Sequence, residues 1–548
     1  MKLICTLRYC AFLCLMSLFG CEKMVEKIGP VLVLNGDPNF GETWAGEKIT
    51  RNFVVKNSGG EQATGLTLQL PEGYTSTKSP APGNVAPKDS LLFDVTFAPN
   101  ASGVFSGDLI VKRSDNNAAL TKTLTGKAWD KIWDKAVGGS SSDAFTELVM
   151  TSDGGHLLGG FSTSGIFGDK TQAARGQNDY WVVKTNTNGD KIWDKTFGGD
   201  QNDFLASILP TADGGYLLGG RSNSGISGDK SQSTKNDGDE DYWIVKINAN
   251  GDKQWDKTYG GFSFDILRSM VATADGGYLL GGESASGISA DKTQVGKGSY
   301  DLWIVKISAN GDKIWDKSFG GSNIEGLSQI VPTSDGGFLL AASSTSGISG
   351  DKTQAAKGEE DFWVVKINAN GDKLWDRAFG GTKGEYLASV ITTSDGGFLL
   401  GGGSSSGATG DKTQASKGEN DFWVVKINAN GDKLWDRAFG GNGYDYCTQL
   451  AGASDGTIII AGTSSSGISG DKTQASKGEN DYWIVKMNAN GDKVWDRAFG
   501  GTQGESLDGI VATPDGGFLL GGQSMSAISG DKTHGARGTA DYWIVKIK

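Results

Sequence analysis

The sequence predicts an all-β protein in which a small β-sandwich is followed by a seven-bladed β-propeller of four-stranded blades. Two observations predict the propeller: a glycine-rich turn recurs with a period of 60 or 62 residues, and two series of tryptophans keep the same step. A third observation predicts the sandwich, because residues 28–128 lack this period but alternate apolar and polar residues between turns.

Each repeat is expected to contain four short strands. In one copy the β-rich runs are residues 445–453, 457–464, 481–487 and 493–499. The last two are joined by "NANG", and Asn-Gly between such runs is a strong hairpin signal because glycine accepts the positive φ of the turn. The "DGG" turn or its variant marks seven copies, at Asp153, Asp213, Asp275, Asp335, Asp395, Asp455 and Asp515.

The two ends of the repeat region predict how the ring closes. The region begins with a lone fourth strand at 131–137 and stops after a third strand. The last blade therefore takes its fourth strand from the start of the region. This predicts that Lys131–Val137 pairs with Tyr542–Ile547, which leaves no unpaired edge.

The motifs "DGGFLLGG", "DYWIVK", "NANGDK" and "FGG" resemble the repeats of bacterial secreted and lipid-anchored β-propeller proteins. The resemblance covers residues 129–548. It implies the fold but no particular ligand, because propellers carry unrelated functions.

Residues 28–128 contain "VVKNSGG", "LLFDVTFAPNASGVFSGDLIV" and "TLTGKA". These segments resemble the immunoglobulin-like domains of hydin-type proteins. The resemblance implies a β-sandwich that acts as a spacer or an adhesion module.

The N-terminal residues predict export. Lys2 and Arg8 precede the apolar run "YCAFLCLMSLFG", which is too short for a permanent transmembrane helix. Its end, "LFGC", resembles the lipobox of bacterial lipoproteins. That implies a signal peptide at residues 1–20, a lipid on Cys21 and a tether at residues 21–27. The alternative is an ordinary signal peptide with a chance cysteine.

These features predict a lipid-anchored protein of the bacterial cell envelope, at the outer membrane, and leave open which side it faces. The net charge of −12 is spread without a basic tract, so no nucleic-acid partner is expected. Only Cys21 and Cys447 remain after removal of the signal, so no internal disulfide framework is available. The expected partners are the membrane, through the lipid, and a protein or glycan. We expect a monomer without a cofactor.

The residue types offer no evident catalytic set. His156 and His534 are the only histidines, whereas a triad needs nucleophile, base and orienting group together and zinc needs more ligands. The "GDKTQ" loop at Asp169 and its sister copies offers oxygens to calcium, but the adjacent lysine opposes a cation. Metal binding is left open beside the alternative of a self-capping loop. We expect that the protein is not an enzyme.

One repeated feature is a candidate site. Four residues after the second glycine of each "GG" every copy has an acid, and Asp and Glu are mixed. The mixture favours a role for charge over a turn cap, because Glu caps a local backbone poorly. We predict an acidic channel mouth that attracts a cation or a basic partner; the alternative is separately solvated carboxylates paired with lysines. The acids are Asp143, Asp203, Asp265, Glu325, Glu385, Asp445 and Glu505.

Three functions are weighed. The favoured one is a lipid-anchored envelope protein that displays the propeller as a binding or scaffold module for a macromolecule or glycan. The second is a carbohydrate-active enzyme with carboxylates at the propeller mouth, and the third is a structural envelope component. An enzyme should break the repeat symmetry at a few loops, and the largest departures are only "NDGDED" at 236–241 and "DGTIII" at 455–460.

Overall fold

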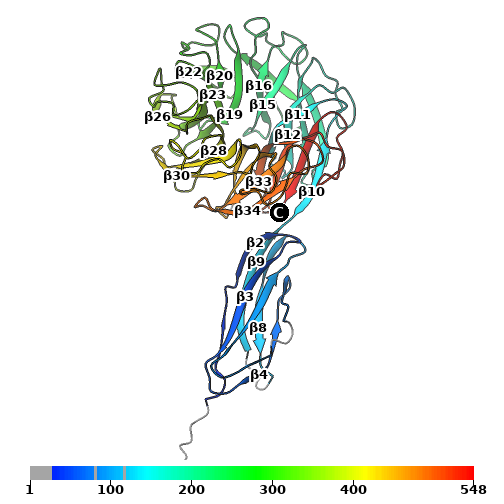
Figure 1. The fold of residues 1–548 in the computed structure, drawn as a ribbon. Coiled ribbons are helices and arrows are strands. Elements are labelled where there is room, and N and C mark those ends of the chain that lie inside the picture. Colours follow the sequence, from blue (N-terminus) through cyan, green and yellow to red (C-terminus); the bar gives the residue numbers. More distant parts are fainter. Residues whose placement is uncertain (1–27, 79–82, 115–118, 454) are drawn as a thin grey trace, which may run out of the picture. The chain divides into compact units, whose positions relative to one another are not determined.

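The computed structural model describes residues 28–78, 83–114, 119–453 and 455–548. The predicted signal peptide, the lipidation site Cys21 and the tether lie outside these ranges. The chain divides into two compact units, with the boundary between Ala128 and Trp129. All regular structure in the described ranges is β (Figure 1), and they contain no helix with the length and apolarity needed to span a bilayer.

The first unit is a β-sandwich of two antiparallel sheets. Side chains alternate along its strands between core and solvent, because successive residues of a strand point to opposite faces. Phe53 and Val55 of one sheet and Leu109 of the other are fully buried in this core. One sheet has the order β1 (Leu32–Asn35), β3 (Ile49–Asn57), β7 (Ser90–Phe97), β5 (Tyr74–Thr75), and the other β2 (Asn39–Trp44), β9 (Ala119–Trp129), β8 (Gly103–Lys112), β4 (Ala63–Gln69), β6 (Gly83–Val85).

The second unit is a ring of four-stranded antiparallel sheets (Figure 1). Among the described residues seven such sheets follow one another, and their first strands contact each other in a closed cycle in which β35 meets β11. The first strands therefore surround the centre of the ring, and the fourth strands form its outer edge. The predicted all-β propeller is confirmed.

Every sheet repeats the same strand bounds. The first strands are β11 (Asp143–Met150), β15 (Asp203–Pro210), β19 (Asp265–Ala272), β23 (Glu325–Pro332), β27 (Glu385–Thr392), β31 (Asp445–Gly452) and β35 (Glu505–Ala512). The second strands are β12 (His156–Ser162), β16 (Tyr216–Ser222), β20 (Tyr278–Ser284), β24 (Phe338–Ser344), β28 (Phe398–Ser404), β32 (Ile458–Ser464) and β36 (Phe518–Ser524). The third strands are β13 (Asp179–Thr185), β17 (Asp241–Ile247), β21 (Asp301–Ile307), β25 (Asp361–Ile367), β29 (Asp421–Ile427), β33 (Asp481–Met487) and β37 (Asp541–Ile547). The fourth strands are β14 (Lys191–Phe197), β18 (Lys253–Tyr259), β22 (Lys313–Phe319), β26 (Lys373–Phe379), β30 (Lys433–Phe439), β34 (Lys493–Phe499) and, in the last sheet, β10 (Lys131–Val137).

The ring closes as the sequence predicts. Strand β10 pairs antiparallel with β37, from Lys131 opposite Ile547 to Val137 opposite Tyr542. The last sheet thus combines residues from both ends of the repeat region, and neither end leaves an open edge.

A buried tryptophan on each third strand connects that strand to the fourth. The indole Nε1 of Trp243 donates a hydrogen bond of 3.1 Å to Asp256 of β18. In the last sheet Trp543 donates one of the same length to Asp134 of β10, although the two residues are 409 positions apart. Burying a ring of this size stabilises the fold by about 4 to 6 kcal/mol.

An aromatic contact joins neighbouring sheets at six boundaries of the described ring, and Leu302 takes the place of the tyrosine or phenylalanine at the seventh. The ring of Tyr242 lies 4.9 Å from that of Trp303 in the next sheet, and its hydroxyl donates to the Trp303 carbonyl at 2.9 Å. A Cβ at Gly282 would lie 2.8 Å from this hydroxyl and 1.9 Å from a backbone oxygen, which explains the second glycine of the "GG" in this second strand. Tyr542 makes the same contact with Trp181, so the last sheet is joined to the first.

We expect a chain that begins at residue 140, and so lacks β10, to melt at least about 5 °C below a chain that begins at residue 129. Without β10 the Trp543 indole loses its acceptor and β37 becomes an exposed apolar edge. Both truncations lack the sandwich, so its loss cancels when differential scanning calorimetry compares them. Equal melting temperatures would rule out closure by β10.

Candidate functional site

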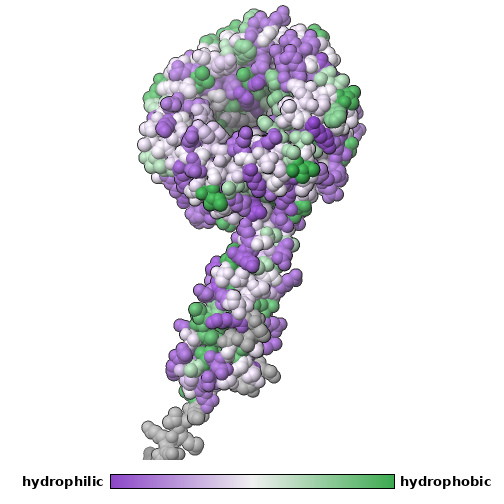
Figure 2. Space-filling model, turned by 45° about the vertical axis from the view of Figure 1, so that its right-hand side comes forward, coloured by the Kyte–Doolittle hydropathy of each residue, from purple (hydrophilic) through white to green (hydrophobic). Residues whose placement is uncertain are grey.

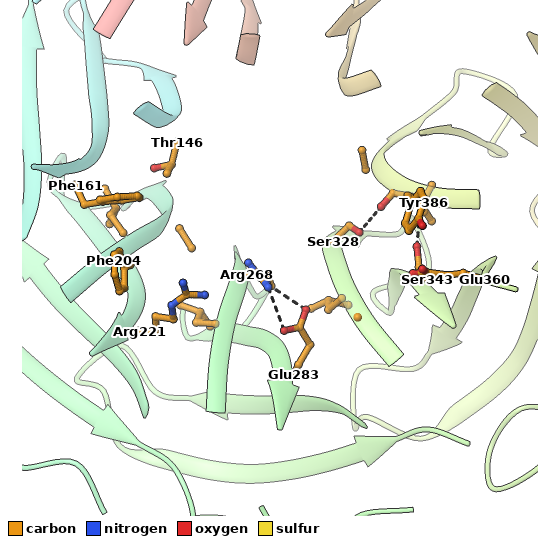
Figure 3. Close-up of a pocket in the computed structure, with 17 residues that line it drawn as sticks. Thr146, Phe161, Phe204, Arg221, Arg268, Glu283, Ser328, Ser343, Glu360 and Tyr386 are labelled. Atoms are coloured by element: carbon orange, nitrogen blue, oxygen red, sulfur yellow. Dashed lines mark hydrogen bonds and ion pairs between the residues drawn. The ribbon is translucent and has the colours of Figure 1, made fainter. Parts of the chain in front are cut away.

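The ring is hollowed at its centre (Figure 2), and a cavity of about 530 Å³ lies against its wall. The wall is built by five consecutive first strands, β11, β15, β19, β23 and β27, together with residues of the neighbouring second strands. Figure 3 shows the side chains of these strands converging on the cavity.

The cavity wall carries a β-bulge in every sheet. The pairing of each first strand with its second strand skips one residue, the fourth of the first strand. A bulge bends the strand and redirects the unpaired side chain, and such bulges are common beside functional sites. Five of these bulge residues line the cavity: Thr146, Ala206, Arg268, Ser328 and Ala388.

These wall residues differ between sheets, whereas the residues behind them repeat. The third residue of the first strand is buried in all seven copies and is leucine in five. The bulge residue that follows it is a cation in one copy, an anion in another and a small neutral residue in the rest. The cavity therefore has a chemistry that no single repeat possesses.

One part of the wall combines aromatic rings with a cation. Phe161 and Phe204 pack edge to face with ring centres 4.9 Å apart. The Arg221 guanidinium lies 4.8 Å from the Phe204 ring centre and is 3.2 Å from the Glu240 carboxylate. Burial raises the pKa of Glu240, and the positive charges of Arg221 and Arg268 oppose that shift. Arg221 is thus held between a ring face and a carboxylate.

An ion pair occupies the middle of the wall. Arg268, the bulge residue of β19, donates to both carboxylate oxygens of Glu283 on β20, at 3.1 and 3.3 Å. Glu283 is only 8% exposed. Arg268 neutralises this buried carboxylate and holds it in place through the two hydrogen bonds. In Figure 3 this pair lies between the Phe204 and Arg221 side and the Tyr386 side.

The opposite part of the wall contains a perturbed carboxyl group. Burial, together with the nearby charge of Asp361, raises the pKa of Glu360 to about 7. Glu360 can therefore act as a hydrogen-bond donor or acceptor near neutral pH. Tyr386, which also lines the cavity, is 52% exposed, and burial followed by the charge of Glu360 raises its pKa.

The seven acids predicted to form an exposed channel mouth are buried instead. Their exposed fractions are 0%, except 2% for Glu505, and each accepts a hydrogen bond from the backbone N–H of the glycine four residues earlier. The expected exposure is therefore corrected: each acid closes its own turn, from the fourth strand of one sheet to the first strand of the next. The residues concerned are Asp143, Asp203, Asp265, Glu325, Glu385, Asp445 and Glu505.

The mixture of Asp and Glu has a structural explanation. Glu385 accepts from Gly381 at 2.7 Å and from the Ser404 hydroxyl at 2.8 Å, so one carboxylate spans a turn and a second-strand end. Asp143 connects the equivalent Gly139 and Ser162. Both acids therefore reach the equivalent glycine N–H and the equivalent serine hydroxyl. Reasoning from a single local turn does not anticipate the serine, because it belongs to another strand. Buried lysines, such as Lys352 beside Glu325, compensate part of the charge.

The remaining sequence candidates are structural. His156 is only 2% exposed, and its Nδ1 lies 3.2 Å from the Thr185 hydroxyl. Cys447 is buried, and burial raises the pKa of its thiol to about 12. In the parts of the chain that the structure describes, no group of three or more His, Cys, Asp or Glu side chains is arranged to hold a metal ion.

Sequence reasoning missed the wall residues because it looked for broken symmetry in the loops. The signal was present in the first strands: aligning the copies shows that the bulge position varies while its neighbour stays leucine in most of them. The bulge itself was not predicted, so the sequence did not indicate that the variable side chains face the cavity.

A family model matches the first of the two units. Residues 30–127 match the family model for the HYDIN/CFA65/VesB-like, Ig-like domain, which confirms the immunoglobulin-like resemblance of the sandwich. The regulatory protein FlaEY of Caulobacter vibrioides is 22% identical over 545 residues, which cover 91% of this chain and 52% of that protein. The chain therefore spans about half the length of this relative.

Two solved structures are remotely similar. A quinonprotein alcohol dehydrogenase-like protein from Bacteroides thetaiotaomicron aligns at 11% identity with a TM-score of 0.36, over 84% of this chain and 93% of its own. BBS1N in complex with ARL6DN aligns at 10% identity with a TM-score of 0.40, over 76% of this chain and 96% of its own.

We expect Glu385→Ala to lower the free energy of unfolding by about 2 kcal/mol, because the Gly381 N–H and the Ser404 hydroxyl lose their acceptor. Glu385→Asp should cost less than half as much, since Asp closes the equivalent turn in four other copies. Urea denaturation measures both values. Calcium or magnesium should not raise the melting temperature. If either ion raised it for the wild type but not for Glu385→Ala, the predicted cation-binding role would be supported instead.

Proposed function

We propose that the protein is a binding or scaffold module that holds a macromolecule or a glycan against the cavity wall of its propeller. A propeller with an immunoglobulin-like domain suggests such a role. The observation that supports it most strongly is the distribution of differences between repeats: the blade framework is repeated, and the bulge residues on the wall differ. Different side chains on rigid strands can distinguish one partner from another.

The chemistry of the wall supports a partner with both apolar and polar groups. The cavity volume of about 530 Å³ lies within the range of ligand sites, about 300 to 1,000 Å³. Phe161 and Phe204 offer aromatic surface, whereas Arg221 and Glu360 offer hydrogen bonds. The Caulobacter relative is named a regulatory protein, and regulation by binding a partner is compatible with this role.

The geometry gives less support to a carbohydrate-active enzyme. Glu360 has the raised pKa that a general acid needs. The other carboxyl group that lines the cavity, Glu283, is already bonded through both oxygens to Arg268. A glycosidase needs a second carboxylate that is free to act as nucleophile or base, so we propose that this site binds without catalysis.

We also propose that Cys21 carries a lipid that attaches the protein to the outer membrane of a bacterial envelope, with the sandwich as a spacer. The apolar run that ends in "LFGC" supports this proposal. A structural envelope component is the remaining alternative, and it gives no reason for the wall residues to differ.

We expect a photo-cross-linker attached at Ala388→Cys on the cavity wall to capture a partner from the envelope fraction of the source cells. The same cross-linker at Leu374→Cys, an exposed position of the outer strand β26, should capture none. Adding Arg268→Ala to the wall variant should lower the yield at least fivefold. Equal capture from both positions would contradict the proposed site.

We expect Cys21→Ser to move the protein from the membrane fraction to the soluble fraction after detergent-free lysis, because the lipid provides the attachment. Immunoblotting of the two fractions measures the shift, with Cys447→Ser as the control that should stay in the membrane fraction. An unchanged distribution of Cys21→Ser would show that the attachment lies elsewhere.

A further inference from the structure

A second groove, of about 470 Å³, adjoins the cavity between β27 and β31. Tyr386 and Ala388 line both spaces, so the groove extends the wall described above. Three tyrosines line the groove, Tyr386, Tyr444 and Tyr446, with exposed fractions of 52%, 43% and 48%. Aromatic rings left half exposed together in a concavity are characteristic of ligand sites rather than of a core.

The tyrosines are rigidly held. The rings of Tyr444 and Tyr446 are 5.8 Å apart and nearly parallel, at 3°. The backbone of Tyr444 is fixed on both sides, because its N–H donates to the Ser465 hydroxyl and its carbonyl accepts from the Ser465 N–H. Tyr446 and Tyr386 lie within paired strands, opposite Thr463 and Gly403. The stacking surface is therefore preorganised.

The groove also contains an unused hydrogen-bond acceptor. Asn420 lines it, is only 5% exposed, and its side-chain oxygen has no hydrogen-bond partner among the described residues. Gly403 makes room for this amide, since a Cβ there would lie 2.6 Å from the oxygen. The sister positions of Gly403 carry side chains in all six other copies. A buried oxygen without a partner destabilises the free protein, and a hydrogen-bond donor on a ligand would remove that cost.

The groove is rich in hydrogen-bond acceptors. Glu419 lines the groove, and its hydrogen bond to the Tyr444 hydroxyl raises the pKa of that tyrosine. No Lys or Arg is among the described residues that line it. A ligand must therefore supply donors without negative charge.

We infer that this groove binds a neutral carbohydrate. This inference rests on the proposed binding function and specifies its ligand. The apolar C–H face of a sugar ring packs on the tyrosine rings, while its hydroxyl groups donate to Asn420 and Glu419. An acidic sugar is disfavoured by Glu419. A proline-rich peptide also fits aromatic grooves, but proline has no N–H to donate to these acceptors.

The test titrates the full chain with soluble polysaccharides by calorimetry: laminarin, xyloglucan, galactomannan and dextran as neutral probes, alginate as an acidic one, and a polyproline peptide. At least one neutral polysaccharide should bind. Tyr446→Ala should weaken that binding at least tenfold and Asn420→Ala at least fivefold. Phe262→Ala, which removes a 62% exposed ring from the turn before β19, should change it less than twofold.

The outcomes separate this inference from the proposed function. Binding of no neutral polysaccharide, binding that Tyr446→Ala leaves unchanged, or tyrosine-dependent binding of polyproline would overturn the carbohydrate assignment. If the cross-linker at residue 388 still captures a protein partner and the capture depends on Arg268, the proposed binding function holds even though the carbohydrate assignment is wrong. Failure of both experiments would overturn both. Melting curves of the variants must match the wild type, which the exposure of Tyr446 leads us to expect.

Discussion

The hydrogen bond between a buried tryptophan indole and an aspartate is the interaction on which the ring depends. It joins the third and fourth strands of each sheet, as in Trp363 and Asp376 at 3.1 Å. The aspartate also accepts from the Thr353 backbone and hydroxyl, so one carboxylate holds two strands and a loop. Burial raises the pKa of Asp376, but these bonds and the one from Lys373 outweigh it and lower the pKa.

The same bond explains closure. In the last sheet the acceptor is Asp134, which comes from the other end of the repeat region and also binds Thr533. Its folded-state pKa is lowered, so the stability it contributes is present above the pKa of about 3.9 in the unfolded chain. That contribution is lost as the pH falls below this value through the lowered pKa. Acid should therefore weaken the closing sheet and the other sheets through the same chemistry.

A repeated framework also leaves the wall of the cavity free to vary. Stability resides in the tryptophans, the leucines behind the bulges and the turn-closing acids, which are almost identical in every copy. The bulge residues are not part of this repeated set. Arg268 in one sheet and Ala388 in another therefore fit the same backbone, and groups such as Glu360 and Tyr386 can be placed without disturbing it. This division allows a symmetric ring to carry an asymmetric site.

The sequence by itself determined the period and the strands of each blade, because hydrophobic spacing and turn residues act locally. It also determined the pairing of Lys131–Val137 with the last strand, because the repeat region begins with a lone fourth strand and stops after a third. It did not determine the wall. A bulge breaks the two-residue alternation of a strand, so the direction of Arg268 cannot be read from its neighbours. Burial of Glu385 was likewise decided by the tertiary structure, since its partner Ser404 comes from another strand. The tyrosine groove exists only because packing brings Tyr386 and Tyr446 of two sheets together with the amide of Asn420.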